Sequence, residues 1–417
     1  MPDPTPDDVR AEVAAWARAN WDPALSVADW WRRLADAGWA HPALPEHAGG
    51  RGWGRELTQA VLRGLKDAGA IGPPPGLGTM LAAPTIAVHG SAEQIARYIP
   101  PILDGSLAWC QLFSEPGAGS DLAGLQTRAV RDGDEWIISG QKVWTSGGQV
   151  ADMGMLLART DPDQPKHRGI TWFAFDMRQP GVDVRPLREM TGRALFNEVF
   201  IDEARAPHDA IIGDLNDGWK VANTTLAVER ASLGTGGVSL PSAVAGTIAG
   251  HLGRRAGDFA SRAGGEGEGA AASANAAGVS QLIALAQQLG RSGEPIVRDA
   301  LAQLWSLVEI NRLNSLRARS GQGRTGGEGN LAKLAMSELF RQFREVGNLV
   351  IGADGLLGSD DSGTGGFVQE MTMFSPGPSI CGGTDQVQRN IIGERVLGLP
   401  KEPGPDRDTP FKALLQN

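Results

Sequence analysis

A run of small and turn-forming residues ends the first third of the chain: Ser114-Glu115-Pro116-Gly117-Ala118-Gly119-Ser120-Asp121. Backbone without bulky side chains lets a flat ligand approach main-chain N–H groups, and the hydroxyls of Ser114 and Ser120 add short hydrogen-bond donors. A glycine-rich turn also closes many ordinary β domains. By itself, this segment therefore leaves two interpretations open, a ligand-binding loop and a structural one.

A second segment with possible chemistry follows at Gly140-Gln141-Lys142-Val143-Trp144-Thr145-Ser146-Gly147. An indole such as that of Trp144 can stack on an aromatic ligand, while neighbouring hydroxyls bond to the polar edge of that ligand. A lone tryptophan in a β domain is more often a core residue. The segment indicates a binding surface only in combination with the first one.

A third segment lies near the C-terminus, where Gly382-Gly383-Thr384 precedes a helical pattern. The free N–H groups and the positive dipole end of a helix favour an anion such as phosphate. Thr384 is also a good N-cap residue, which explains the same pattern without any ligand. Both interpretations remain open.

The hydrophobic spacing divides the chain into three parts. Apolar residues recur at helical spacing from residue 7 to about 103, and short β-type runs follow at 135–138, 153–157, 170–175 and 198–201. Helical spacing returns at 219–233, 279–289, 297–318 and 331–350. We therefore predict an α+β fold with an N-terminal helical domain (1–108), a middle β domain (109–214) and a C-terminal helical bundle (215–417). The low-complexity tract 263–278 lacks large apolar residues, and we expect a mobile surface excursion there.

Composition excludes several classes of protein. A chain of 417 residues with 41% hydrophobic residues has material for a large core, and a net charge of -9 argues against a nucleic-acid partner. The two cysteines lack metal-type spacing and the six histidines are scattered, so we expect a reducing compartment and no metal. No apolar run reaches the length of a membrane span. We expect a cytoplasmic protein without membrane contact.

The order of these parts and motifs resembles the acyl-CoA dehydrogenase family over nearly the whole chain. Further matches are the segments 198–207, 218–219, 383–389 and 394–398. The resemblance implies FAD between the β domain and the bundle, an acyl-CoA substrate, α,β-desaturation, and electron-transferring flavoprotein as acceptor. It also implies which residues surround the flavin or the thioester, namely Gln111, Phe113, Ser114, Gly119, Ser120, Trp144, Thr145, Ser146, Thr384 and Gln386.

The catalytic base is the first departure from the commonest family pattern. In the medium-chain members a glutamate directly precedes the Gly-Thr pair, and this chain has Gly382 there. Relatives resembling isovaleryl- and long-chain acyl-CoA dehydrogenases instead carry the base on an earlier helix before an arginine, which matches Glu229-Arg230. The resemblance thus implies Glu229 as the base. The alternative is a solvated glutamate on a helix surface.

The cofactor contacts are the second departure. The family's Arg-x-x-Phe-Gly has Ala286 and Leu289 in place of Arg and Phe, and its glutamine is Leu349, which leaves Arg291 as a substitute. In many members these contacts reach the FAD of a neighbouring subunit, so their loss here removes part of that inter-subunit contact. The resemblance implies a homo- or hetero-oligomer, dimeric or tetrameric. Three hypotheses remain: an active dehydrogenase, a non-catalytic or heteromeric-partner member, and a flavoprotein that oxidises another substrate, such as a nitroalkane or a carrier-bound intermediate.

Overall fold

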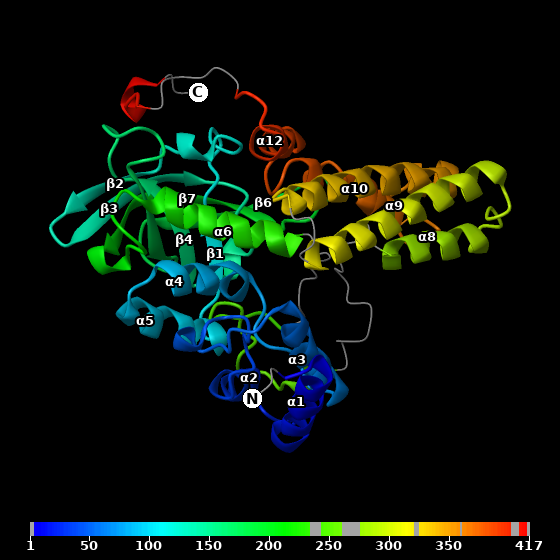
Figure 1. Ribbon diagram of the computed structural model, residues 1–417, viewed down its shortest axis with the longest axis horizontal. Helices are drawn as coiled ribbons and strands as arrows, with labels where there is room; N and C mark the ends of the chain where they lie inside the picture. Colours follow the sequence, from blue (N-terminus) through cyan, green and yellow to red (C-terminus); the bar gives the residue numbers. More distant parts are fainter. Residues whose placement is uncertain are drawn as a thin grey trace.

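The computed structural model describes residues 4–233, 243–260, 276–320, 325–358, 361–401 and 408–414. A helical N-terminal domain, a β domain and an elongated helical bundle follow one another along the chain (Figure 1), which confirms the predicted α+β architecture. The first domain consists of α1 (Pro6–Asn20), α2 (Val27–Asp36), α3 (Arg55–Asp67), the π-helical turn η2 (Gly78–Ala82), α4 (Ala83–His89) and α5 (Ala92–Leu103).

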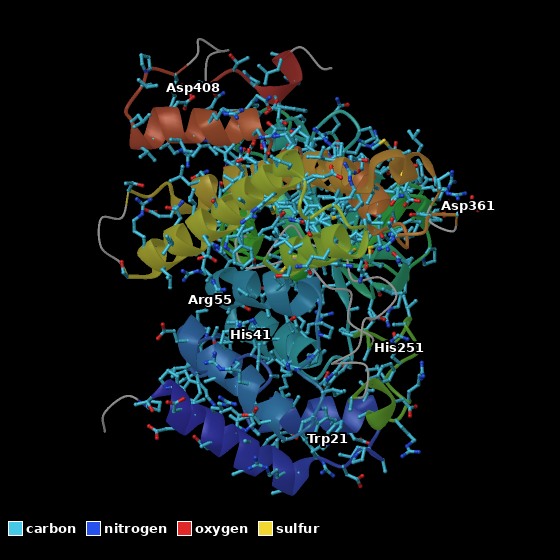
Figure 2. The ribbon with its side chains drawn as sticks, turned by 90° about the vertical axis from the view of Figure 1, so that its right-hand side faces the viewer. Trp21, His41, Arg55, His251, Asp361 and Asp408 are labelled. Carbon is cyan, nitrogen blue, oxygen red and sulfur yellow. The ribbon has the colours of Figure 1, made fainter. Side chains whose placement is uncertain are left out.

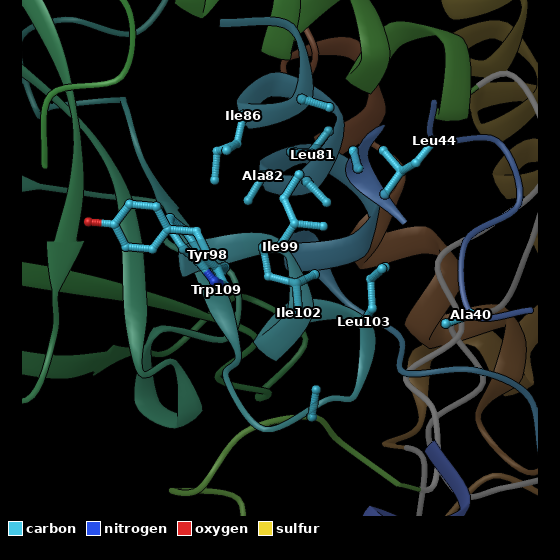
Figure 3. Close-up of a cluster of buried hydrophobic side chains, with 14 of the residues drawn as sticks. Ala40, Leu44, Leu81, Ala82, Ile86, Tyr98, Ile99, Ile102, Leu103 and Trp109 are labelled. Carbon is cyan, nitrogen blue, oxygen red and sulfur yellow. The ribbon is translucent and has the colours of Figure 1, made fainter. Parts of the chain in front are cut away.

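Capping residues mark the N-terminal ends of the first two helices. Thr5 and Asp8 form a reciprocal capping box at the start of α1, and the Ser26 side chain caps α2. The apolar face of α2 includes Trp30 and Trp31, whose indole N–H groups donate to backbone carbonyls of the proline-rich loop at 2.8 and 3.0 Å. Figure 3 shows the aliphatic core that α4 and α5 share with Trp109 at the start of the β domain. Burial of this continuous core fixes the N-terminal domain against the first strand.

The middle part is a seven-stranded sheet in the order β1-β4-β2-β3-β7-β6, with β5 paired to β4. Strand β1 runs parallel to β4, and Gln111 lies opposite Met155. All residues of β4 are buried, as are all but the last of β5, which explains their nearly continuous apolar sequence. The strands are β1 (Trp109–Leu112), β2 (Arg128–Asp132), β3 (Glu135–Lys142), β4 (Met153–Arg159), β5 (Ile170–Asp176), β6 (Val182–Leu187) and β7 (Phe196–Pro207).

Helix α6 (Gly218–Leu233) links the β domain to the bundle and packs against α4. Two polar contacts join these helices: Thr85 and Thr225 share a hydroxyl–hydroxyl bond of 3.0 Å, and His89 Nε2 lies 2.7 Å from Thr224 Oγ1. Side-chain bonds of this kind fix the rotation of α6 about its axis. The bundle helices are α8 (Ala276–Gln288), α9 (Pro295–Ser320), α10 (Glu328–Ile351), α11 (Phe367–Phe374) and α12 (Asp385–Ile391).

Residues 243–260, between α6 and α8, return to the N-terminal domain. Backbone N–H groups of Val27 and Ala256 donate to Arg254 and Leu25 at 2.9 and 2.8 Å, and Phe259 on the short helix α7 (Gly257–Ala260) is buried in the core of that domain. In Figure 2, His251 of this segment lies in the half of the molecule that also holds Trp21. The predicted mobile tract 263–278 lies outside the described residues as far as residue 275, and its last three residues begin α8.

In the part of the chain that the structure describes, no helix is long and apolar enough to cross a membrane. No group of three or more His, Cys, Asp or Glu side chains is arranged to hold a metal ion there. Cys110 and Cys381 are both free thiols.

Candidate active site

The glycine-rich segment 114–121 forms a tight turn at the end of β1. Glu115 and Ala118 exchange two backbone hydrogen bonds, of 3.1 and 3.0 Å. Below this turn, the Glu115 carboxylate accepts the backbone N–H groups of Gln126 and Thr127 at 2.6 and 2.9 Å and the Lys142 ammonium at 2.8 Å. The carboxylate therefore closes the base of the loop, while Gly119 and Ser120 remain exposed at its tip.

The two β-domain motifs are joined by this buried ion pair. Lys142 is fully buried, and its ammonium also donates to the Phe113 carbonyl at 3.1 Å. Burial by itself would raise the pKa of Glu115, but the Lys142 charge and the hydrogen bonds hold it below its usual value. Burial likewise lowers the pKa of Lys142, and Glu115 opposes that shift. A further bond of 3.0 Å from the Val143 N–H to the Ser114 carbonyl completes the junction.

Trp144 has a backbone conformation that L-residues rarely adopt. Its φ is +63°, its side chain is 56% exposed, and its ring meets Phe196 edge to face at 5.7 Å. A bulky residue at positive φ costs free energy, and such strain concentrates at binding sites. Next to it, Thr145 is fully buried and its hydroxyl has no hydrogen-bond partner among the described residues, while Ser146 is exposed. An exposed aromatic face beside an unpartnered hydroxyl fits a flat, polar-edged ligand such as a flavin.

Glu229 projects from α6 toward the end of β1, and its Oε2 accepts the Gln111 side-chain amide at 3.3 Å. Helix α6 also packs against α10, and α10 contacts both α12 and the turn that precedes it. Gly382, in that turn, has φ +62° and carries no side chain. Glu229 and the turn that contains Gly382 thus lie on elements that both pack against α10.

Thr384 caps α12, and its Oγ1 accepts the Val387 N–H at 3.2 Å. Thr384 is therefore the N-cap of α12, as the structural interpretation of the sequence expected, and Gln386 is exposed two residues further along. A side chain of α12 fixes the turn before it, because Gln388 Nε2 donates to the Gly382 carbonyl at 2.7 Å.

A buried polar cluster anchors the same turn to α10. The Asp385 carboxylate accepts Lys333 Nζ at 2.9 Å, Ser337 Oγ at 2.7 Å and Arg341 Nη1 at 2.9 Å. Although burial opposes it, these donors hold the pKa of Asp385 far below its usual value. This cluster was not predicted from the sequence; its signal was a row of polar residues at three- and four-residue spacing along α10, namely Asn330, Lys333, Ser337 and Arg341.

The two departures from the family's cofactor contacts lie within the bundle. Ala286 is buried in its core, and Arg291 Nη1 donates to the carbonyls of Leu349 and Val350 at 2.7 and 2.9 Å, while Nε bonds to Glu294 at 2.8 Å. The α8–α9 connection that carries Arg291 lies at the end of the bundle away from the β domain (Figure 1). A single chain therefore does not bring Arg291 to the loop 114–121.

The predicted residues of the β domain lie in two places. Gln111 lies beside Glu229, whereas the loop 114–121 and Trp144 lie beyond the end of β1. Gln111 points to Glu229, whereas the Phe113 side chain is buried in the core and offers only backbone to a ligand. The loop 114–121 then leads directly to the surface that carries Trp144. Glu115 and Lys142 belong to one motif each, but the ion pair that joins them was not predicted.

Comparison with known proteins identifies the family of the three domains. Models of the acyl-CoA dehydrogenase N-terminal, middle and C-terminal domains match residues 6–106, 110–203 and 269–397. These three matches cover most of the chain and define an acyl-CoA dehydrogenase architecture. Acyl-CoA dehydrogenase IpdE1 of Mycobacterium tuberculosis (strain ATCC 25618 / H37Rv) is 36% identical over 374 residues, which cover 89% of this chain and 88% of that protein.

The chain belongs to the acyl-CoA dehydrogenase family and is an oxidoreductase that acts on acyl-CoA, as its motifs predicted. Solved structures agree: the Tcur3481-Tcur3483 steroid ACAD has a TM-score of 0.70 and 26% identity, covering 95% of this chain and 98% of that one. The ChsE4-ChsE5 complex from Mycobacterium tuberculosis has a TM-score of 0.67 and 25% identity, covering 96% and 99%.

Proposed function

We propose that this protein performs FAD-dependent α,β-dehydrogenation of an acyl-CoA thioester, with Glu229 as the base. The observation that carries the proposal is the Glu229 carboxylate of α6, bonded to Gln111 of β1 at 3.3 Å where α6 also packs against α10 of the bundle. A glutamate from α6 thereby replaces a glutamate at the vacated position. The reaction needs one carboxylate at this place, whichever helix supplies it.

Glu229 accepts the proton from the α-carbon of the thioester. Such a proton is weakly acidic, so the base works best with a raised pKa, and an apolar acyl group that excludes water from the partly buried carboxylate raises it. The Gln111 amide orients the carboxylate by donating to one of its oxygens. Gln111 is thus a positioning residue for the base.

The β-domain residues that would bind FAD belong to the loop 114–121 and to the segment 144–146. Trp144 offers its ring face, Thr145 its unpartnered hydroxyl, Ser146 its exposed hydroxyl, and Gly119 and Ser120 their accessible backbone. Thr384 and Gln386 approach from the bundle. FAD, when bound, supplies the acceptor for the hydride that leaves the β-carbon. We propose electron-transferring flavoprotein as the subsequent electron acceptor.

A heteromeric assembly is the second candidate, and the bundle favours it. Ala286 is buried and the guanidinium of Arg291 is engaged within its own bundle, so this chain contributes little to a cofactor in a neighbouring subunit. Two similar solved structures carry two-component names, and one of them is called a steroid ACAD. We propose that a different subunit completes the cofactor site and that the acyl group is bulky and ring-bearing.

The absorbance spectrum of the purified protein tests these proposals. We expect flavin absorbance, either for this chain alone or after co-expression with a second family member, and its anaerobic bleaching by a ring-bearing acyl-CoA. A yellow protein that no acyl-CoA bleaches would support a flavoprotein with another substrate. A protein that stays colourless in excess FAD, with or without the second subunit, would contradict FAD dependence.

A further inference from the structure

A buried arginine lies beneath the loop that carries Gly119 and Ser120. Arg159, at the end of β4, is 4% exposed, and its Nη2 donates to the carbonyls of Ala123 and Leu125 at 2.7 and 3.4 Å. Its Nη1 donates to the Lys166 carbonyl at 2.8 Å. One guanidinium therefore binds two segments: residues 123–125, which follow the glycine-rich turn, and residues 160–169, which connect β4 and β5 in a hairpin.

The other face of this guanidinium is covered by the C-terminal segment. The Phe411 ring centroid lies 3.7 Å from Arg159 Cζ, and Phe411 is 7% exposed. Burial lowers the pKa of Arg159 to about 10, so the side chain stays charged at neutral pH and the cation–π contact persists. Such a contact is strongest where water is excluded, as it is here.

Backbone bonds hold the C-terminal segment in this place. The Phe411 N–H donates to the Gln164 carbonyl at 2.9 Å, and the Lys412 N–H donates to the Pro162 carbonyl at 3.1 Å. Figure 1 shows this last segment, in red, beside the β domain, although it follows the bundle in sequence. The segment therefore packs on the β4–β5 connection of the domain that carries the glycine-rich loop.

The β4–β5 hairpin, on which Phe411 packs, also contacts the glycine-rich loop directly through a surface ion pair. Lys166 Nζ bonds to the Asp121 carboxylate at 2.7 Å, at the last residue of the glycine-rich turn. Phe411, Arg159 and the hairpin thus form one stack that ends on residues 121–125.

We infer that Phe411 is a positioning residue, which fixes the flavin-binding loop through Arg159 and so sets the affinity for FAD. This inference rests on the proposed FAD site. Without the ring, the guanidinium loses one of its two buried faces to water, and the loop samples more conformations. FAD binding must then order the loop, and this ordering weakens the observed affinity.

The test compares three variants with the wild type, in the assembly that binds FAD. Phe411→Ala removes the ring, Phe411→Leu keeps an apolar side chain without the aromatic face, and Lys412→Ala removes only an exposed ion pair with Asp163 on the same segment. We expect the dissociation constant for FAD to rise about tenfold in Phe411→Ala and less in Phe411→Leu, with no change in Lys412→Ala.

Hydrogen exchange of the FAD-free protein gives a readout independent of the cofactor. Amides of residues 118–125 are expected to exchange faster in Phe411→Ala than in Lys412→Ala or the wild type, while amides of the bundle stay unchanged. Equal exchange and equal FAD affinity in all four proteins would overturn the inference. A wild-type assembly without FAD affinity would overturn the proposed function instead, and the exchange data would still decide whether Phe411 orders the loop.

Discussion

At the scale of single residues, the site depends on a few side chains held in costly states. Lys142 and Glu115 are ionised inside the protein, and Trp144 adopts a positive φ. Buried charges are tolerated because each is paired and hydrogen-bonded. The sequence pointed to Trp144 and Thr145 as ligand contacts, but neither the strain at Trp144 nor the Glu115–Lys142 pair was predictable, since both depend on how two distant segments meet.

The buried pair makes a prediction about stability. Lys142→Met leaves the Glu115 carboxylate buried without its partner, and we expect the free energy of unfolding to fall by about 3–5 kcal/mol. The double variant Glu115→Gln/Lys142→Met is expected to recover part of this loss, because no unpaired charge remains. Urea unfolding followed by circular dichroism measures both. A single variant as stable as the wild type would show that Lys142 does not stabilise the carboxylate.

Because Trp144 is strained, a substitution there is expected to weaken FAD binding without a matching loss in the free energy of unfolding. Glycine adopts positive φ freely, so Trp144→Gly is expected to leave the stability of the FAD-free protein within about 1 kcal/mol of the wild type, as relief of strain offsets the lost contact with Phe196. The same variant should bind FAD at least about tenfold more weakly. Unchanged FAD affinity, measured by titration of the FAD-free protein, would remove Trp144 from the site.

At the scale of elements, most helices and strands followed their hydrophobic periods, and α6, α9 and α10 lie where helical spacing placed them. The segment 243–260 did not, because few of its residues are large and apolar and its anchors are mainly backbone bonds. Asp152 is the main side-chain anchor: it is buried and accepts the N–H groups of Ala108 and Thr247, at 2.9 and 3.1 Å, and the Thr247 hydroxyl. Such bonds have no signature in a single sequence.

This anchor can be tested by substitution. Asp152→Asn replaces a carboxylate that accepts several donors with an amide that places its own N–H₂ against some of them, and we expect a loss of about 2–3 kcal/mol in the free energy of unfolding. Thr247→Ala removes one donor and should cost about 1 kcal/mol. Limited proteolysis should also cut residues 243–260 faster in Asp152→Asn. If both variants matched the wild type in thermal unfolding and proteolysis, the segment would be held by other contacts.

At the scale of the whole molecule, three parts of the chain meet at the helix that carries Glu229. Helix α6 is fixed by α4 of the N-terminal domain, Gln111 of the edge strand β1 bonds to Glu229, and α10 of the bundle packs against α6. The order of the motifs was sufficient to predict the family and the α+β architecture. The return of the C-terminal segment to the β domain was not predictable, because a single phenylalanine after a proline-rich stretch gives no indication of where it packs.

The most direct test of the account is the rate of anaerobic flavin bleaching by an acyl-CoA substrate in Glu229→Gln. Glutamine keeps the size of the side chain but cannot accept the α proton, so we expect FAD to be retained and the bleaching rate to fall by at least about a thousandfold. Glu12→Gln, an exposed change on α1, serves as the control and should bleach like the wild type. Bleaching of Glu229→Gln at the wild-type rate would show that another group removes the proton.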